Sequence, residues 1–327
     1  MVKIGTHDGT FHCDEALACF LLKRLPEYQD AEIVRTRDLE KLKACDIVVD
    51  VGAVFDPATH RYDHHQREFQ ETMTTLSGGK YRWSTRLSSA GLVYYHFGKA
   101  IIAAILPDAS AEQIDTLFSK MYGGFVEEID AVDNGVSQYE EGSPKYHIGS
   151  TVSTRVGRIN PSWKETDTDM MPRFERAMAL VGGEFVEVLK SYYESWLPAR
   201  DVVKEALETR FEVDPSGEII KLPIWCPWKS HLYDLEAEMG TEEKPINIKY
   251  ALYVDSHNAW RVLCASITPG SFVCRKALPE AWRGLRDADL EAKSGIAGAT
   301  FVHASGFTGG NKTYEGALAM AKAGLEA

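Results

Sequence analysis

Arg61-Tyr62-Asp63-His64-His65-Gln66 is the stretch around which this chain can be organised. An aspartate followed at once by two histidines brings three metal-ligating or phosphate-binding groups into one short turn. A sheet surface gains no stability from such a cluster. The alternative is a polar loop that happens to contain histidines, so the flanking sequence is needed to choose between the two interpretations.

Short apolar runs around this stretch predict strands that alternate with a helix. The expected elements are strands over 2–6, 32–36, 46–52 and 60–65 and a helix over 14–25. The run Ile47-Val48-Val49 is typical of a strand that is covered on both faces of a sheet. This pattern predicts an α/β fold with a largely parallel sheet and helices on both faces. Because ligands bind at the carboxyl ends of such strands, the 7–15 loop, Asp50 and the Asp-His-His stretch should meet at one edge.

The rest of the first domain should contain a mobile surface loop over 66–85, a helix from Ser88 or Ser89, and a helix over 111–133 that stops at Asn134-Gly135. The remainder of the chain predicts a second, α+β domain. Its expected elements are a helical region over 169–210 that is broken or bent around Gly182-Gly183 and Pro198, hairpins over 211–222 and 247–267, a strand over 300–303, a glycine-rich loop and a helix from about Lys312. Residues 136–164 have scattered Gly, Ser and Pro and no periodicity, as is typical of a connection between domains. We therefore expect one domain over 1–160 and another over 161–327.

Composition narrows the functional class. The 327 residues carry a formal net charge of -12, which argues against indiscriminate binding to nucleic acid or to an anionic membrane but allows a local basic groove. No apolar window is long enough to span a membrane, and no secretory signal is visible. The six cysteines lack paired spacing, so we expect reduced, mostly buried thiols. A cytoplasmic protein is the default expectation.

Four separate segments contribute carboxylates or imidazoles of the kind that bind metals. The candidates are His7, His12, Asp14, Asp50, Asp63, His64, His65 and Asp133, with Asp130 as an alternative to Asp133. Mixed Asp and His ligands suit Mn, Fe or Zn better than Ca, which prefers oxygen alone. Their number is sufficient for two ions about 3.5 to 4 Å apart, an arrangement that can activate water against phosphorus.

The order of these motifs resembles the DHH phosphoesterase superfamily, which includes RecJ-type nucleases and family II inorganic pyrophosphatases. The segment Leu87-Ser88-Ser89-Ala90-Gly91-Leu92 is similar to the one that follows the Asp-His-His motif there. A closer resemblance, to the melanocyte-proliferating-gene family, rests on two stretches: Gly5-Thr6-His7-Asp8-Gly9-Thr10-Phe11-His12-Cys13-Asp14-Glu15 and Phe301-Val302-His303-Ala304-Ser305-Gly306-Phe307-Thr308-Gly309-Gly310-Asn311-Lys312. This resemblance covers essentially the whole chain and implies a metal-dependent RNA exonuclease.

The resemblance also implies a role for each candidate. The implied metal ligands are His7, His12, Asp14, Asp50, His64 and Asp133. Asp50 would bridge two ions, Asp63 would orient an imidazole and His65 would face the phosphate, so that Asp50, Asp63, His64 and His65 form the catalytic set. The superfamily usually has an aspartate where this chain has His12, which leaves Asp8 as a substitute candidate.

A second resemblance concerns the C-terminal domain. The glycine-rich stretch between a strand and a helix can hold an anion on backbone amides, and it matches the substrate-binding loop of DHH-associated domains. The implied substrate-binding residues are His65, Arg158, His303, Ser305, Gly306, Gly309, Gly310 and Lys312.

These inferences together predict a Mn-dependent RNA exonuclease that uses metal-activated water, with two Mn²⁺ ions or with Mg²⁺ or another divalent cation in their place. One alternative is a phosphodiesterase or phosphatase for short oligonucleotides or small phosphorylated molecules. Another is a metal-stabilised RNA-binding protein without turnover. By resemblance to the family, a nuclear or mitochondrial address is an alternative to the cytoplasm.

Overall fold

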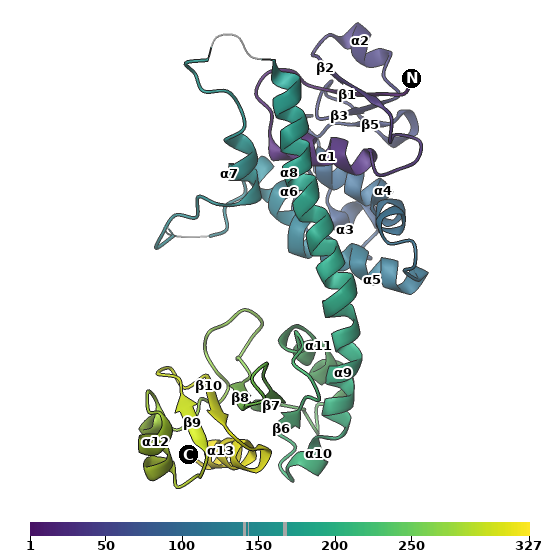
Figure 1. Ribbon diagram of the computed structural model, residues 1–327. Coiled ribbons are helices and arrows are strands. Elements are labelled where there is room, and N and C mark those ends of the chain that lie inside the picture. The colour runs from purple at the N-terminus through teal and green to yellow at the C-terminus, as the bar shows by residue number, and fades with distance from the viewer. Residues whose placement is uncertain (140–141, 143, 166–168) are drawn as a thin grey trace. The chain divides into compact units, whose positions relative to one another are not determined.

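Figure 1 shows the computed structural model, which describes residues 1–139, 142, 144–165 and 169–327. The chain forms two compact units, Met1–Tyr193 and Glu194–Ala327. The expected domain boundary after residue 160 and the expected connection over 136–164 fall within the first unit, and residues 140, 141 and 143 of that connection lie outside the described residues. The extent of each functional domain therefore stays a prediction.

The first unit contains a five-stranded sheet in the order β2-β1-β3-β5-β4. Its strands are β1 (Lys3–Thr6), β2 (Glu32–Arg35), β3 (Ile47–Val49), β4 (Phe55–Asp56) and β5 (Arg61–Tyr62). All neighbours in the sheet are parallel except β4 and β5, so the largely parallel sheet predicted from the sequence is confirmed. The chain leaves β1 at His7, β3 at Asp50 and β5 at Asp63, which places the predicted residues at one edge.

Helices cover both faces of this sheet because alternate residues of β3 face opposite ways. Ile47 and Val49 join the main core with α1 (Cys13–Leu22), whereas Val48 packs in a smaller cluster with Leu42 of α2 (Leu39–Lys43). On the main-core side, α4 (Ser89–Ile105) and α8 (Met170–Ser191) pack against α1. Since α1 follows the loop that carries His7 and His12, this packing fixes the position of the site.

The prediction of a break at Gly182-Gly183 is wrong, because α8 continues through both residues. Gly182 is buried where a Cβ atom would overlap the ring of Phe20 in α1, so the glycine permits close helix packing and does not end the helix. The irregularity comes later, in the π-helical segment η3 (Tyr192–Trp196) that precedes α9 (Leu197–Glu208).

The remaining helical elements of the first unit are η1 (Pro57–Thr59), α3 (Met73–Leu76), α5 (Ala111–Met121), the π-helical η2 (Tyr122–Val126), α6 (Glu127–Asp133) and α7 (Val152–Gly157). The end of α6 before Asn134-Gly135 confirms the predicted stop signal. The interpretation of residues 66–85 as a surface loop is wrong in part, since Phe69 and Met73 are buried and Thr72 caps the short helix α3.

The second unit is built on another five-stranded sheet, in the order β6-β7-β8-β10-β9. Its elements are α10 (Arg210–Val213), β6 (Ile219–Lys221), α11 (Lys229–Met239), β7 (Tyr250–Val254), β8 (Trp260–Cys264), η4 (Glu280–Trp282), α12 (Asp287–Ser294), β9 (Ala299–Val302), β10 (Thr308–Asn311) and α13 (Tyr314–Glu326). The hairpin of β7 and β8 confirms the prediction for 247–267. The predicted hairpin over 211–222 is wrong, because residues 210–213 are helical and β6 pairs in parallel with β7.

The predicted glycine-rich loop over 305–312 is wrong in part, because only residues 305–307 lie in a turn. Gly309 and Gly310 belong to β10, an interior strand paired with β8 on one side and β9 on the other. A Cβ atom at Gly309 would lie 2.9 Å from a Leu278 methyl carbon, and one at Gly310 would lie 2.7 Å from the Thr300 hydroxyl oxygen. Close packing in the sheet therefore accounts for both glycines.

Two further findings concern the polarity of the helices and the state of the cysteines. Within the described residues, every helix is too short or too polar to cross a membrane. All six cysteines are free thiols, and five of them are buried, as the unpaired spacing predicted.

Candidate metal centre

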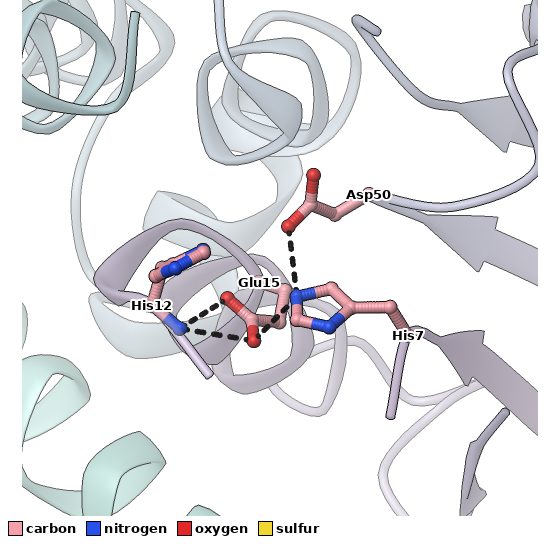
Figure 2. Close-up of side chains that lie close together, drawn as sticks. All are labelled: His7, His12, Glu15 and Asp50. Carbon is pink, nitrogen blue, oxygen red and sulfur yellow. Dashed lines mark hydrogen bonds and ion pairs between the residues drawn. The ribbon is translucent and has the colours of Figure 1, made fainter. Parts of the chain in front are cut away.

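His7 follows β1 and points its Nε2 atom at two carboxylates (Figure 2). Its Nδ1 atom lies 2.9 Å from the carbonyl oxygen of Asp8, and because a carbonyl only accepts, Nδ1 carries the hydrogen. Nε2 lies 3.0 Å from Glu15 Oε1 and 3.4 Å from Asp50 Oδ2. A backbone bond that fixes the tautomer in this way is typical of metal-binding histidines, since the other nitrogen is left for the cation.

Asp50 stands at the centre of the site immediately after β3. Its φ of 57° lies in the left-handed region, which aspartate tolerates better than most residues. The side chain is buried, and although burial alone would raise its pKa, hydrogen bonds from His64 and His7 lower the pKa to about 2. Asp50 is therefore an ionised carboxylate that faces two imidazoles.

His64 forms the other half of the site with two more aspartates. Its Nε2 atom lies 3.1 Å from Asp133 Oδ2, 3.4 Å from Asp50 Oδ1 and 3.8 Å from Asp14 Oδ2. Burial lowers the pKa of the imidazole, but the bonds to Asp133 and Asp50 outweigh burial and raise it to about 11. A proton on this ring occupies the position that a cation would take among three carboxylates.

Asp14 is held by the first turn of α4. Its oxygens accept hydrogen bonds from the Ser88 hydroxyl at 2.6 Å and from the backbone amides of Ser89 at 3.0 Å and Ala90 at 2.5 Å. These donors fix the carboxylate so that one oxygen faces His64. Burial, together with the charges of Asp133 and Asp50, raises the pKa of Asp14, so a nearby cation would stabilise its ionised form.

Asp130 and Asp133 have different environments, although both belong to α6. Asp130 is fully buried and accepts hydrogen bonds from Ser88 and from the Tyr122 hydroxyl, and burial raises its pKa to about 7. Asp133 instead reaches His64. The geometry therefore brings Asp133 to the metal centre and assigns Asp130 to the support of the α4 N-terminus.

Asp63 and His65 form a supporting pair beside Asp50. The Nδ1 atom of His65 donates to Asp63 Oδ1 at 2.7 Å, while Asp63 Oδ2 accepts from the Ala53 amide at 2.5 Å. The His65 side chain is 60% exposed, in contrast to that of His64 at 3%. Asp63 thus orients His65, whose remaining nitrogen is available to a substrate.

The chemistry of this donor set fits divalent cations. Three groups each gather donor atoms within 4.8 Å of one another: His7, His12, Glu15 and Asp50; Asp50, His64 and His65; and Asp14, His64 and Asp133. Asp50 belongs to two of these groups, as expected of a carboxylate that bridges two adjacent ions, and His64 also belongs to two, although one imidazole nitrogen can bind only one ion. The buried Nδ1 atom of His64 has no hydrogen-bond partner in the described part of the chain.

Glu15 is the member of the site that the sequence interpretation missed. It is fully buried in the first turn of α1, where its two oxygens accept the backbone N–H of His12 at 3.1 and 2.9 Å. The signal was present in the spacing, because a glutamate three residues after a helix N-cap forms a capping box that turns its carboxylate back toward the preceding loop. Here that loop carries His7 and His12.

The predicted substrate-binding residues are divided between the two units. Arg158 follows α7 in the first unit and donates to the Gly149 carbonyl. In the second unit, His303 and Ser305 bond each other in the turn between β9 and β10. Gly306 lies in the same turn with a φ of 74°. Lys312 is exposed after β10, and the role of all these residues in substrate binding stays a prediction.

Two cavities border the metal centre within the first unit. One, of about 380 Å³, lies between the start of α1, α6 and α7 and includes His12, Asp14 and Asp133 in its wall. The other, of about 490 Å³, includes His7, His12, Asp50 and His65 and also contains Arg37. The metal-binding residues therefore lie between two spaces that could hold the two sides of a substrate.

The chain matches the sequence model of the uncharacterised protein family UPF0160 over residues 3–325. It is 57% identical over 325 residues to the MYG1 exonuclease of Homo sapiens, a match that covers 99% of this chain and 85% of the relative. Identity to MYG1 proteins is 50% over 327 residues in Caenorhabditis elegans (99% and 95% covered) and 45% over 332 residues in Schizosaccharomyces pombe (100% and 98% covered). No solved structure matches the chain.

Proposed function

The chain belongs to the UPF0160 protein family, and from this premise we propose that it is a metal-dependent phosphodiester hydrolase of the DHH type that acts as an RNA exonuclease. The observation that carries the proposal is the set of three donor groups, linked through Asp50 and His64, at the carboxyl edge of a parallel sheet. Several relatives are named MYG1 exonuclease, and this name agrees with hydrolysis at the end of a nucleic acid.

Two cations, which we propose to be Mn²⁺, would be held by the three groups of donors. His7, His12, Glu15 and Asp50 would surround one ion, and Asp14, His64 and Asp133 together with Asp50 the other. Divalent cations in such a site lower the pKa of water and neutralise charge that develops on the phosphoryl oxygens. The burial of Asp14, Asp50 and His64 excludes bulk water from the ligands.

The Asp63–His65 pair would then serve the substrate. Because Nδ1 of His65 is committed to Asp63, only Nε2 can face a phosphate or the oxygen of a leaving group. The bond to Asp63 raises the pKa of His65, which favours the protonated form of the ring. A protonated, exposed imidazole beside buried ligands is suited to hold a phosphoryl oxygen or to donate a proton to the departing hydroxyl.

RNA end-labelled at one terminus tests this proposal. Wild-type protein with Mn²⁺ should shorten the RNA stepwise, and chelation, Asp50→Ala or His64→Ala should each abolish the reaction. Asp108→Ala is the control, since Asp108 is an exposed carboxylate between α4 and α5 that takes no part in the site. Metal binding by the wild type without shortening of any labelled RNA would contradict the proposal.

A further inference from the structure

We propose that the cavity between the start of α1, α6 and α7 is a nucleoside subsite, which receives the base and ribose on one side of the phosphodiester that the metal centre cleaves. This inference rests on the proposed function and adds the part of the substrate that is recognised beside the phosphate. The cavity is named here the α6–α7 cavity; its wall includes Phe11, Ile129, Val132, Ser153, Thr154 and Gly157.

The position of the α6–α7 cavity connects it directly to the proposed chemistry. His12, Asp14 and Asp133 belong both to its wall and to the metal-binding groups. A phosphate placed on those ligands therefore has the cavity as its immediate neighbour. A group that is covalently attached to this phosphate can enter the cavity without crossing any other part of the protein.

The wall chemistry favours an uncharged ring system over a second phosphate. Phe11, Ile129 and Val132 provide apolar surface, and Val132 remains 52% exposed on α6. The wall contains no lysine or arginine, whereas Asp14 and Asp133 are acidic, so an anion not held by a cation would be repelled. Ligand sites of this type are mostly apolar with a few placed polar groups, and about 300–1,000 Å³ is their usual size.

The few polar groups are hydroxyls of the kind that bind the edge of a base or a ribose. Thr154 bonds Thr151 through its hydroxyl, and Ser153 Oγ faces the Cys13 thiol. Ser153 Oγ has no further hydrogen-bond partner in the described residues, although it is buried from solvent. Thr154 is partly exposed in the wall, so its hydroxyl can bond a bound base or sugar, whereas Ser153 Oγ could do so only after its side chain rotates toward the cavity.

The cavity on the other side of the metal centre includes an arginine beside the carboxylates of Asp50 and Asp63. It contains Arg37, whose side chain is 67% exposed and lies 3.2 Å from Asp8, and it also includes His65. Cationic groups suit the negative backbone of the chain that continues beyond the cleaved bond. The two cavities together thus match a nucleoside on one side and a phosphate-bearing strand on the other.

Gly157 allows the subsite to be filled without touching a metal ligand. It is the last residue of α7, and a Cβ atom added there meets no atom within 4 Å. Gly183 of α8 is the matched control, because it is also helical, also has open space at its Cβ position and lies outside the α6–α7 cavity. The series Ala, Leu and Phe at position 157, with the same series at 183, grades the volume introduced.

The experiment compares two diesters in Mn²⁺: the dinucleotide UpU, and methyl 2,2,2-trifluoroethyl phosphate, which has neither a nucleoside nor a ring. Gly157→Leu and Gly157→Phe should raise KM for UpU at least about tenfold, equivalent to about 1.4 kcal/mol of binding free energy, and should leave hydrolysis of the methyl ester unchanged. Gly183→Phe should change neither. Saturation-transfer NMR of UpU in the presence of a chelator provides a second readout, in which transfer to the base protons should be lost in Gly157→Phe only.

The outcomes of these measurements separate the subsite from the proposed function. A Gly157→Phe protein with wild-type KM for UpU would overturn the subsite, and so would an equal loss on both diesters that Gly183→Phe does not share. If the wild type hydrolyses neither diester, the NMR comparison alone supports the subsite or overturns it, and the proposed function fails only if labelled RNA is not shortened either.

Discussion

Replacing either of two adjacent glycines in α8 by alanine should change the stability of the first unit in opposite directions. A Cβ atom on Gly182 would come closer than 3.0 Å to three ring carbons of Phe20, including Cγ, a separation that real Cβ atoms do not show. Phe20 cannot escape by a small rotation, because Cγ moves only if χ1 or the backbone changes. A Cβ atom on Gly183 meets nothing within 4 Å.

The magnitude follows from two terms. Alanine in a helix interior is favoured over glycine by about 0.5–1 kcal/mol, and this gain is common to both variants. Overpacking a filled core costs about 1–3 kcal/mol, and this cost applies to Gly182→Ala alone. We therefore expect Gly183→Ala to stabilise the first unit by about 0.5–1 kcal/mol and Gly182→Ala to be about 1–3 kcal/mol less stable than Gly183→Ala.

Urea unfolding followed by amide hydrogen exchange of α1 and α8 measures this difference for the first unit separately from the second. Equal m-values would show that the variants differ in stability and not in the extent of unfolding. Equal stability of the two variants would refute the reasoning, since it would mean that α1 and α8 can separate at negligible cost. Such a result would also remove the packing explanation for an unbroken α8.

Three further outcomes are expected. Glu15→Gln should weaken Mn²⁺ binding about 10- to 100-fold, as measured by calorimetry, because Glu15 contacts His7 in the site. The control Glu27→Gln should leave the affinity unchanged, because Glu27 is exposed. Equal affinities of the two variants would exclude Glu15 from the site. The stability lost in Asp130→Asn should become smaller as pH rises. The pKa of Asp130 is about 7 in the folded protein and near 3.8 in the unfolded chain, so the wild type loses up to roughly 4 kcal/mol of stability as pH increases between these values. Asparagine does not ionise, so the variant does not share this loss. A constant difference between thermal melts at pH 5 and pH 8 would contradict this. Mn²⁺ should raise Tm in the wild type by mass action and should raise it less in Asp133→Ala, which keeps only the donor group of His7, His12, Glu15 and Asp50; an equal rise in both would exclude Asp133 as a ligand.

The residues that gather at the candidate metal centre could be predicted from the sequence because metal binding requires particular residue types at particular places. A parallel sheet collects the carboxyl ends of its strands, so an aspartate or histidine directly after each predicted strand could be assigned to one edge. His7, Asp50 and Asp63 meet there for this reason. Glu15 is harder to assign to the site from the sequence, because a glutamate three residues after a helix N-cap is already explained by a capping box.

The glycines show where sequence reasoning fails. Gly309-Gly310 and Gly182-Gly183 are both patterns that predict a loop or a helix break, yet one pair lies inside a strand and the other inside a helix. A glycine that permits close approach and a glycine that permits a turn look the same in one sequence, because both are defined by the absence of a side chain. Only the neighbouring atoms, such as the Phe20 ring or the Leu278 methyl group, distinguish the two cases.

Substrate recognition is harder to predict than catalysis for a related physical reason. A cation selects its ligands by charge and donor atom, whereas a nucleoside subsite can be built from any apolar side chains that leave the right space. Ile129 and Val132 are ordinary apolar residues of α6, and Gly157 is the last residue of the next helix, α7. Their proposed common role depends on α6 and α7 both lining the space beside Asp14. If Gly157→Phe closes that space selectively against UpU, the difference between an exonuclease and a general diesterase in this protein will lie in a surface that carries no motif.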